Sequence, residues 1–211
     1  GNRQKVKMLI DTGASHALSL YNYEEGQIVI PEKSFRSYLG RGLNGDIHGE
    51  IAKIDEFGIG SYVLSKPVVN YPDQEDIAIA LKVSDRSGSI GSELLKHFNV
   101  IFDYQNREII LRKSKDFKDP FTYNMSGIDF IAPFPGINYY EISHIRPDSP
   151  AEKVGLKKGD EILFVNGVKA SRFSMNEIIA FFQEKPNRKL RISVIRDGEV
   201  KSFKFVLKNL I

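Results

Sequence analysis

The sequence predicts a mostly β protein (β plus α) made of two domains. Its 211 residues are enough for two small domains. Short apolar runs are separated by Gly, Pro and Asn, a pattern typical of strands joined by turns. The clearest helix signal lies in the second half, where Ser174-Met175-Asn176-Glu177 has the pattern of a capping box.

Composition excludes several classes of protein. The chain has 30 Lys and Arg against 27 Asp and Glu without a basic stripe, so nucleic acid is not an expected partner. Cysteine is absent, which excludes disulfides, thiolate metal sites and cysteine nucleophiles. No apolar run reaches transmembrane length, so we expect no direct membrane insertion of this fragment.

Metal, cofactor and serine chemistry are also not expected. The four histidines lack the spacing of metal ligands, and each is predicted to be a surface or sheet residue: His16, His48, His97 and His144. No serine lies in a nucleophile-elbow pattern with His and Asp in support, which excludes serine hydrolysis. We therefore predict no metal and no cofactor.

The first predicted strand, residues 5–10, delivers an acidic residue into the turn Asp11-Thr12-Gly13. Gly13 permits a close backbone approach, and a strand end on a rigid sheet can hold a reactive side chain still. The triplet alone is equally compatible with an exposed Asp in a strand-end turn. Gly1-Asn2 has the pattern of a hairpin turn, so we expect the strand before it to be missing.

A glycine-rich stretch at residues 40–49 is predicted to be a mobile hairpin. Gly40-Arg41-Gly42-Leu43-Asn44-Gly45 formally matches the dinucleotide fingerprint, but that fingerprint requires a following helix. Instead, Ile47, Gly49 and Ile51 alternate in a strand-like way. The alternative is an ordinary flexible loop.

Further strands are predicted at residues 27–31, 52–57, 61–64, 67–69, 100–104 and 108–111. Between them, Ser92 is predicted to cap a short helix that buries Leu94, Leu95 and Phe98.

Residues 9–14, Leu-Ile-Asp-Thr-Gly-Ala, resemble the active-site turn of retroviral-type aspartic peptidases, the retropepsins, and Ile90-Gly91 resembles the pair that passes beneath that turn. The resemblance covers residues 1–111 and implies an acid-protease β-barrel domain. It implies that Asp11 is catalytic, that the Thr12 hydroxyl ties two facing turns together, and that the Gly13 amide helps to hold the carboxylate. It also implies a substrate flap, whose tip would be Gly42, Leu43, Asn44 and Gly45.

An aspartic peptidase needs two carboxylates that share one proton. The sequence contains no second Asp-Thr-Gly or Asp-Ser-Gly, so one chain cannot supply both. We therefore expect a homodimer with one Asp11 from each copy.

Residues 112–125 are charged, include Pro120, and are predicted to be a linker; a basic nucleic-acid patch is the alternative. Beyond them, local signals are strong. Ser149-Pro150 opens a short helix that ends at Gly155, and Met175 begins a helix that ends before Pro186. Asn166-Gly167 and Asp197-Gly198 each predict a hairpin turn.

The stretches 148–162 and 165–167 resemble the bacterial PDZ domain, and the resemblance covers residues 126–211. It implies that a peptide is held as an added strand beside a helix. The matching carboxylate loop is Gly127-Ile128-Asp129-Phe130, with the helix from Met175 as the other wall. Asp129 replaces the usual second glycine, and its negative charge disfavours an incoming carboxylate, although an internal peptide segment could still bind. Plain core packing of Ile128, Phe130 and Met175 is the alternative.

Together these features predict a homodimeric aspartic endopeptidase whose PDZ domain binds peptide segments, with a protein or peptide substrate. The pairing of a peptidase with a PDZ domain implies, by analogy, a bacterial cell envelope or periplasmic location. The alternative is a non-catalytic peptide-binding or scaffold protein that retains both folds.

Overall fold

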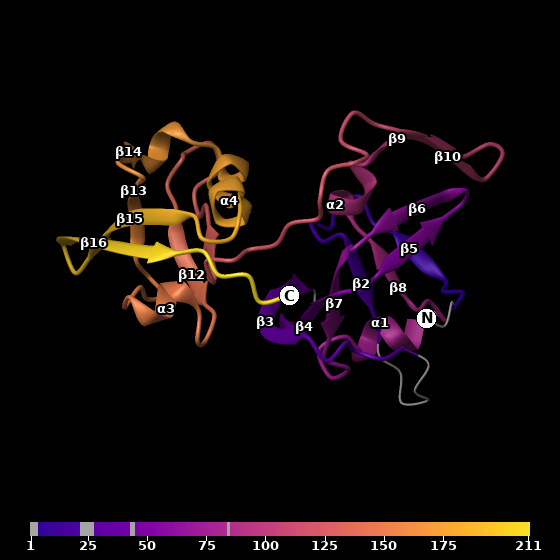
Figure 1. The fold of residues 1–211 in the computed structure, drawn as a ribbon, viewed down its shortest axis with the longest axis horizontal. Coiled ribbons are helices and arrows are strands. Elements are labelled where there is room, and N and C mark those ends of the chain that lie inside the picture. The colour runs from indigo at the N-terminus through magenta and orange to yellow at the C-terminus, as the bar shows by residue number, and fades with distance from the viewer. Residues whose placement is uncertain (1–3, 22–27, 43–44, 84) are drawn as a thin grey trace. The chain divides into compact units, whose positions relative to one another are not determined.

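A computed structural model describes residues 4–21, 28–42, 45–83 and 85–211. The described chain is mostly β, as predicted, with few and short helices. It divides into two compact units, Gly1–Phe121 and Thr122–Leu210 (Figure 1). Across the described residues, no helix combines the length and the apolar character needed to cross a membrane.

A six-stranded sheet forms the centre of the first unit. In spatial order its strands are β1 (Met8–Ile10), β8 (Gly88–Ile90), β2 (Leu18–Leu20), β7 (Val68–Pro72), β4 (Gly45–Lys53) and β3 (Ser34–Gly42). The predicted β-barrel is not found as a closed barrel, because no pairing among the described residues joins β1 to β3. A sheet closes only when its two outer strands pair in register.

The hairpin predicted around residues 40–49 is present as β3 and β4, which pair antiparallel from Ser34–Ala52 to Gly42–Gly45. Of the predicted flap tip, Leu43 and Asn44 lie outside the described residues. Gly42 and Gly45 face each other at the end of the ladder. The role of this hairpin as a substrate flap stays a prediction.

The remaining elements of the first unit are two hairpins and two short helices: β5 (Glu56–Ile59) with β6 (Tyr62–Ser65), β9 (Phe98–Asp103) with β10 (Glu108–Lys113), α1 (Ala78–Val83) and α2 (Ser92–Leu95). The predicted strand at 27–31 is wrong for its described part, where residues 28–31 form no strand and Val29 is 76% exposed. The N-cap of α2 is Gly91, so the predicted capping role of Ser92 is also wrong.

The predicted linker, residues 112–125, contains both strand and buried residues. Arg112 and Lys113 end β10, and Phe121 is buried against the ring of His97, with 4.4 Å between ring centroids. Tyr123 and Met125 are buried in the second unit. Apolar side chains of this charged segment thus belong to the core of one unit or of the other.

The second unit is built on a sheet with the order β11 (Ile128–Ile131), β12 (Glu141–Ile145), β13 (Glu161–Val165), β15 (Lys189–Arg196) and β16 (Glu199–Val206). The short β14 (Val168–Lys169) pairs with β13. The helical elements are α3 (Pro150–Lys153), a 3₁₀ turn (Ala170–Arg172) and α4 (Met175–Gln183).

The elements of this unit follow the local sequence signals. Ser149 caps α3 by accepting a hydrogen bond from the Glu152 amide, and Ser174 and Glu177 form the predicted capping box of α4. Asn166 and Gly167 have φ of 51° and 86°, as a tight hairpin turn requires. These predictions are confirmed.

A buried ion pair holds the turn before β13 against β15. The Asp160 side chain is 1% exposed and accepts two hydrogen bonds from Arg196, at 2.6 and 2.7 Å. The Lys157 amide donates to the same carboxylate, and Arg196 also donates to the Gly155 carbonyl. Both charges are thus compensated, as buried ion pairs require.

Candidate functional site

The predicted catalytic triplet begins where β1 ends. β1 and β8 pair in parallel, with Ile10 opposite Ile90, and the Asp11 amide continues the ladder by donating to the Ile90 carbonyl at 2.9 Å. The pair Ile90-Gly91, separated from Asp11 by almost eighty residues of sequence, therefore lies directly beside the Asp11 turn, residues 11–14.

The Asp11 carboxylate is oriented by its own turn. Its Oδ1 accepts a hydrogen bond of 3.0 Å from the Gly13 amide, and the Ala14 amide closes the turn on the Asp11 carbonyl. Asp11 is half-buried, while Thr12 and Gly13 are exposed. The turn therefore presents a positioned carboxylate oxygen on Asp11 and an accessible hydroxyl on Thr12.

His16 lies close to this carboxylate, although sequence reasoning treated it as an ordinary surface or sheet residue. Burial lowers the pKa of His16, and the nearby Asp11 charge opposes that shift. Its Nε2 is 2.9 Å from the Ser89 hydroxyl of β8. Its position five residues after Asp11, in the segment that turns back along β8, is the sequence signal that could have indicated it.

Gly91 allows the close approach between the Asp11 turn and α2. A Cβ at this position would lie 2.2 Å from the His16 carbonyl oxygen and 2.8 Å from that of Ala14. The Ser92 amide and hydroxyl both donate to the Ala14 carbonyl, at 2.8 and 2.9 Å. Hydrogen bonds and close backbone contacts from residues 91 and 92 therefore fix the Asp11 turn, and they leave no room for a side chain at Gly91.

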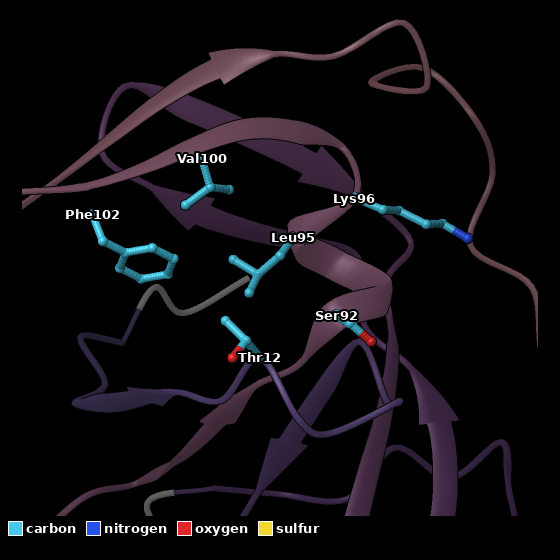
Figure 2. Close-up of a pocket in the computed structure, with 6 residues that line it drawn as sticks. All are labelled: Thr12, Ser92, Leu95, Lys96, Val100 and Phe102. Carbon is cyan, nitrogen blue, oxygen red and sulfur yellow. The ribbon is translucent and has the colours of Figure 1, made fainter. Parts of the chain in front are cut away.

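An apolar hollow of about 310 Å³ opens beside Thr12. It is lined by Thr12, Ser92, Leu95, Lys96, Val100 and Phe102 (Figure 2). Leu95, Val100 and Phe102 gather toward Thr12, whereas the Lys96 ammonium points away. Phe102 is 40% exposed. The surface next to the triplet is thus largely apolar.

In the second unit, an aromatic contact joins β11 to α4. β11 is an outer strand of its sheet, paired only with β12 among the described residues. The Phe130 ring of β11 contacts Phe182 of α4 and Tyr140, with centroids 5.9 and 5.5 Å apart. Phe130 therefore forms an aromatic link between the strand and the helix.

Met175, Ile179 and Phe182 lie on one face of α4, because residues four and three positions apart share a helix face. Met175 and Ile179 are half-buried, so part of each side chain stays accessible. This face of the helix is therefore apolar, and its role as the wall of a peptide groove stays a prediction.

The predicted carboxylate loop, Gly127 to Phe130, lies at the start of β11. Gly127 has φ of 82°, and a Cβ there would lie 2.2 Å from the Ser149 Cβ, so a glycine is required. Ile128 is only 1% exposed, which fits the alternative of core packing for that side chain. Phe130 is half-buried and reaches α4, whereas Ile128 does not line an open surface.

Asp129 is held in a low-polarity position. Burial raises the pKa of its carboxyl to about 6, despite the opposing attraction of Arg146 and a hydrogen bond from Asn124. Burial also lowers the pKa of Arg146, whose guanidinium donates to the Asn124 carbonyl at 3.1 Å. Sequence reasoning missed both Asn124 and Arg146, because neither belongs to the motif of the loop itself.

No group of three or more His, Cys, Asp or Glu side chains in the described ranges is arranged to hold a metal ion.

A family model described as a PDZ domain matches residues 141–196, which take in β12 to β15. The chain therefore contains a PDZ domain, as predicted. The similarity of residues 1–111 to retropepsins stays a prediction.

Several solved structures are similar to the chain at low identity. The PDZ domain of a carboxy-terminal protease from Vibrio cholerae, in complex with peptide, is 15% identical, with 42% of this chain and 96% of that one covered and a TM-score of 0.36. The PDZ domain of EpsC from Vibrio cholerae is 20% identical, with 38% and 75% covered and a TM-score of 0.30.

A structure of the HtrA-type protease AlgW with decapeptide is 14% identical, with 90% of this chain and 63% of that one covered and a TM-score of 0.42. The photosystem II D1 C-terminal processing protease is 18% identical, with 40% and 22% covered and a TM-score of 0.36. The chain thus spans less than two thirds of the length of these last two proteins.

Proposed function

We propose that this protein binds extended peptide segments in the groove between β11 and α4. The observation that carries this proposal is the position of β11 as an outer strand beside the apolar face of α4. An extended peptide that pairs with such a strand gains main-chain hydrogen bonds, and its alternate side chains enter pockets. The match of a PDZ model to residues 141–196 supports the same function.

The groove favours ligands with apolar side chains. Met175 and Ile179 line the helix side, and Phe130 reaches across between Tyr140 and Phe182. Exposed apolar residues continue at the end of β11, at Ile131, and beyond it, at Phe134. A ligand that covers this surface would bury apolar area on both sides of the strand.

Met175→Glu tests the binding function. A carboxylate on the groove wall would be desolvated by an apolar ligand, so we expect affinity to fall about tenfold or more. Retention of a pooled library of random decapeptides on the immobilised full chain, read by mass spectrometry, measures the effect. The matched control is Asn176→Glu, on an exposed neighbouring position of the same helix, which should retain binding. Equal retention by both variants would refute the groove as the binding site.

A second candidate function rests on the geometry of the Asp11 turn. We propose that Asp11 supplies one carboxylate of a peptide-hydrolysing site, as expected from the resemblance to retropepsins. The hydrogen bond from Gly13 to the Asp11 carboxylate and the ladder bond from Asp11 to Ile90 support this role. In such a site, one ionised Asp activates water and its protonated partner stabilises the reacting carbonyl.

The second carboxylate would come from another copy of the chain, because the sequence has no second Asp-Thr-Gly. The apolar hollow beside Thr12 supports this docking, since Val100 and Phe102, which line it together with the buried Leu95, are apolar and partly accessible. A twofold arrangement would place the same hollow of both copies at one interface. Thr12, which is exposed, would then face its counterpart.

Asp11→Asn tests the hydrolytic function. We expect the cleavage rate of unfolded casein, mapped by mass spectrometry at pH 5 and pH 7, to fall by at least about a hundredfold, because an amide cannot share the catalytic proton. The matched control is Asp55→Asn, which changes an exposed carboxylate paired with Lys66 and should retain the full rate. Absence of wild-type cleavage, or equal cleavage by Asp11→Asn, would refute hydrolysis and leave peptide binding as the function.

The two functions combine into one account. The PDZ domain would hold a protein or peptide segment, and the Asp11 turn of a dimer would cleave it. A location in the bacterial cell envelope or periplasm remains a prediction from the pairing of these two domain types.

A further inference from the structure

Asn124, just ahead of β11, fills the start of the carboxylate loop with its own side chain. Its Oδ1 accepts hydrogen bonds from the Ser126 amide at 3.0 Å, the Ser126 hydroxyl at 2.7 Å and the Gly127 amide at 3.2 Å. Three donors thus converge on a single oxygen. This arrangement fixes the orientation of the carboxamide, since only its oxygen can accept.

The amide nitrogen of Asn124 is also engaged. Nδ2 donates to the Ile128 carbonyl at 2.7 Å and to the Asp129 carboxylate at 3.4 Å. The Ile128 amide in turn donates to the Ser126 hydroxyl at 3.0 Å. The backbone amide and the carbonyl of Ile128, the first residue of β11, are therefore both engaged by side chains, of Ser126 and Asn124 respectively.

A peptide C-terminus presents a carboxylate, which needs converging backbone amides to replace its water. Here the amides of Ser126, Gly127 and Ile128 already donate to side chains of the chain itself. A ligand carboxylate would have to displace the Asn124 carboxamide and leave several polar groups without partners. Each such group costs about 1–3 kcal/mol when it is buried.

The surroundings of the loop hold Asn124 in place. The Arg146 guanidinium donates to the Asn124 carbonyl, and the Arg146 amide donates to the Gly127 carbonyl at 2.9 Å. The Ala151 amide of α3 donates to the carbonyl of Ser126, which is fully buried. The Asp129 carboxylate lies on the other side of the carboxamide, where it would repel an incoming anion when ionised.

We propose that Asn124 is a specificity-determining residue of the PDZ groove: its carboxamide takes the place of a ligand carboxylate, so that the groove selects internal peptide segments over free C-termini. This inference rests on the proposed peptide-binding function. Binding then depends on pairing with β11 beyond Ile128 and on the apolar wall of α4.

The test compares decapeptides of random sequence in two matched pools, one ending in a free carboxylate and one ending in a carboxamide. Each pool is passed over the immobilised full chain, and retained peptides are quantified by mass spectrometry. For the wild type we expect retention of acid and amide forms of the same sequence to agree within about twofold, because the amides of Ser126, Gly127 and Ile128 already donate to side chains of the chain itself.

Asn124→Ala should shift this ratio toward the acid form by about tenfold, since it frees the amides of Ser126 and Gly127. Ser126→Ala is a smaller change that frees the Ile128 amide, and it should shift the ratio of acid to amide retention in the same direction. This variant replaces Asn124→Ala in the test if Asn124→Ala does not fold. Asn209→Ala is the matched control, because Asn209 bonds to the Tyr123 hydroxyl outside the loop. It should leave the ratio unchanged.

The outcomes distinguish the proposed role of Asn124 from the proposed peptide-binding function. A wild-type preference for the acid form of about tenfold or more would overturn the role of Asn124 while leaving peptide binding intact. Retention of neither pool would overturn the peptide-binding function, and the inference with it.

Discussion

Gly91→Ala is expected to unfold the region around the Asp11 turn. The new methyl group would lie 2.2 Å from the His16 carbonyl oxygen, and both this atom and the next nearest, the Ala14 carbonyl oxygen, belong to the backbone. To make room, the 14–16 segment must move and weaken the hydrogen bonds that Ser92 and Glu93 donate to it. We expect the free energy of unfolding of the first unit to fall by about 3 kcal/mol or more.

Amide hydrogen exchange of residues 8–20 and 88–95 measures this loss, together with the cleavage rate. The control is Gly58→Ala, in β5, where a Cβ would meet only the Tyr62 carbonyl oxygen at 3.9 Å. That variant should be as stable as the wild type or nearly so. Unchanged exchange in Gly91→Ala would contradict the close contact between the Asp11 turn and α2.

Asp129→Asn is expected to stabilise the second unit at neutral pH. The pKa of Asp129 is raised to about 6 in the folded protein, above its ordinary value of 3.8, because burial outweighs the attraction of Arg146. The folded state therefore binds the proton more tightly, and stability falls as pH rises from about 4 to 6. An amide does not suffer this loss, so the gain at pH 7.5 is up to about 3 kcal/mol.

Urea unfolding of wild type and variant at pH 7.5 and pH 4 checks the sign. The gain should be largest at pH 7.5 and should nearly vanish toward pH 4, where the wild-type carboxyl is protonated when folded. Two basic residues lie near Asp129: His144, opposite it in the β11–β12 ladder, and Arg146. Both are present in wild type and variant, so the difference between the two proteins at each pH reports on residue 129. Asp197→Asn, at an exposed hairpin turn, is the control. A gain that does not depend on pH would contradict burial of an ionisable Asp129.

The second unit could be predicted well from the sequence because its signals are local. The caps at Ser149 and Ser174 and the turn at Asn166-Gly167 specify helix starts and a hairpin within a few residues of sequence. The peptide groove predicted from Met175 and the 127–130 loop stays a prediction. Predicting these elements requires no information about contacts between residues far apart in the sequence.

The features that could not be predicted depend on distant contacts. Ser92 has the side chain of a helix cap, but its hydroxyl instead bonds to the Ala14 carbonyl, 78 residues away in sequence. The short helix α1 has no acidic residue in its first turn, and sequence reasoning did not identify it. Whether the sheet closes into a barrel depends on pairing between β1 and β3, which no local pattern specifies.

Asn124 shows the same limit at the candidate site. Its residue type is common in turns, and nothing in the local pattern indicates that its carboxamide oxygen faces three donors of Ser126 and Gly127. Asp129, by contrast, was recognisable because it departs from the glycine expected there. The proposed preference for internal segments could thus be anticipated from Asp129, whereas the part proposed for Asn124 could not.

The most direct test of the central claim, that peptide pairs with β11, is amide hydrogen exchange of the full chain with and without the most strongly retained decapeptide. A peptide added as a strand should slow exchange along Ile128–Ile131 and over α4, and leave β16, the other outer strand of the same sheet, unchanged. Slower exchange at β16 or in the first unit, with β11 unaffected, would contradict the account.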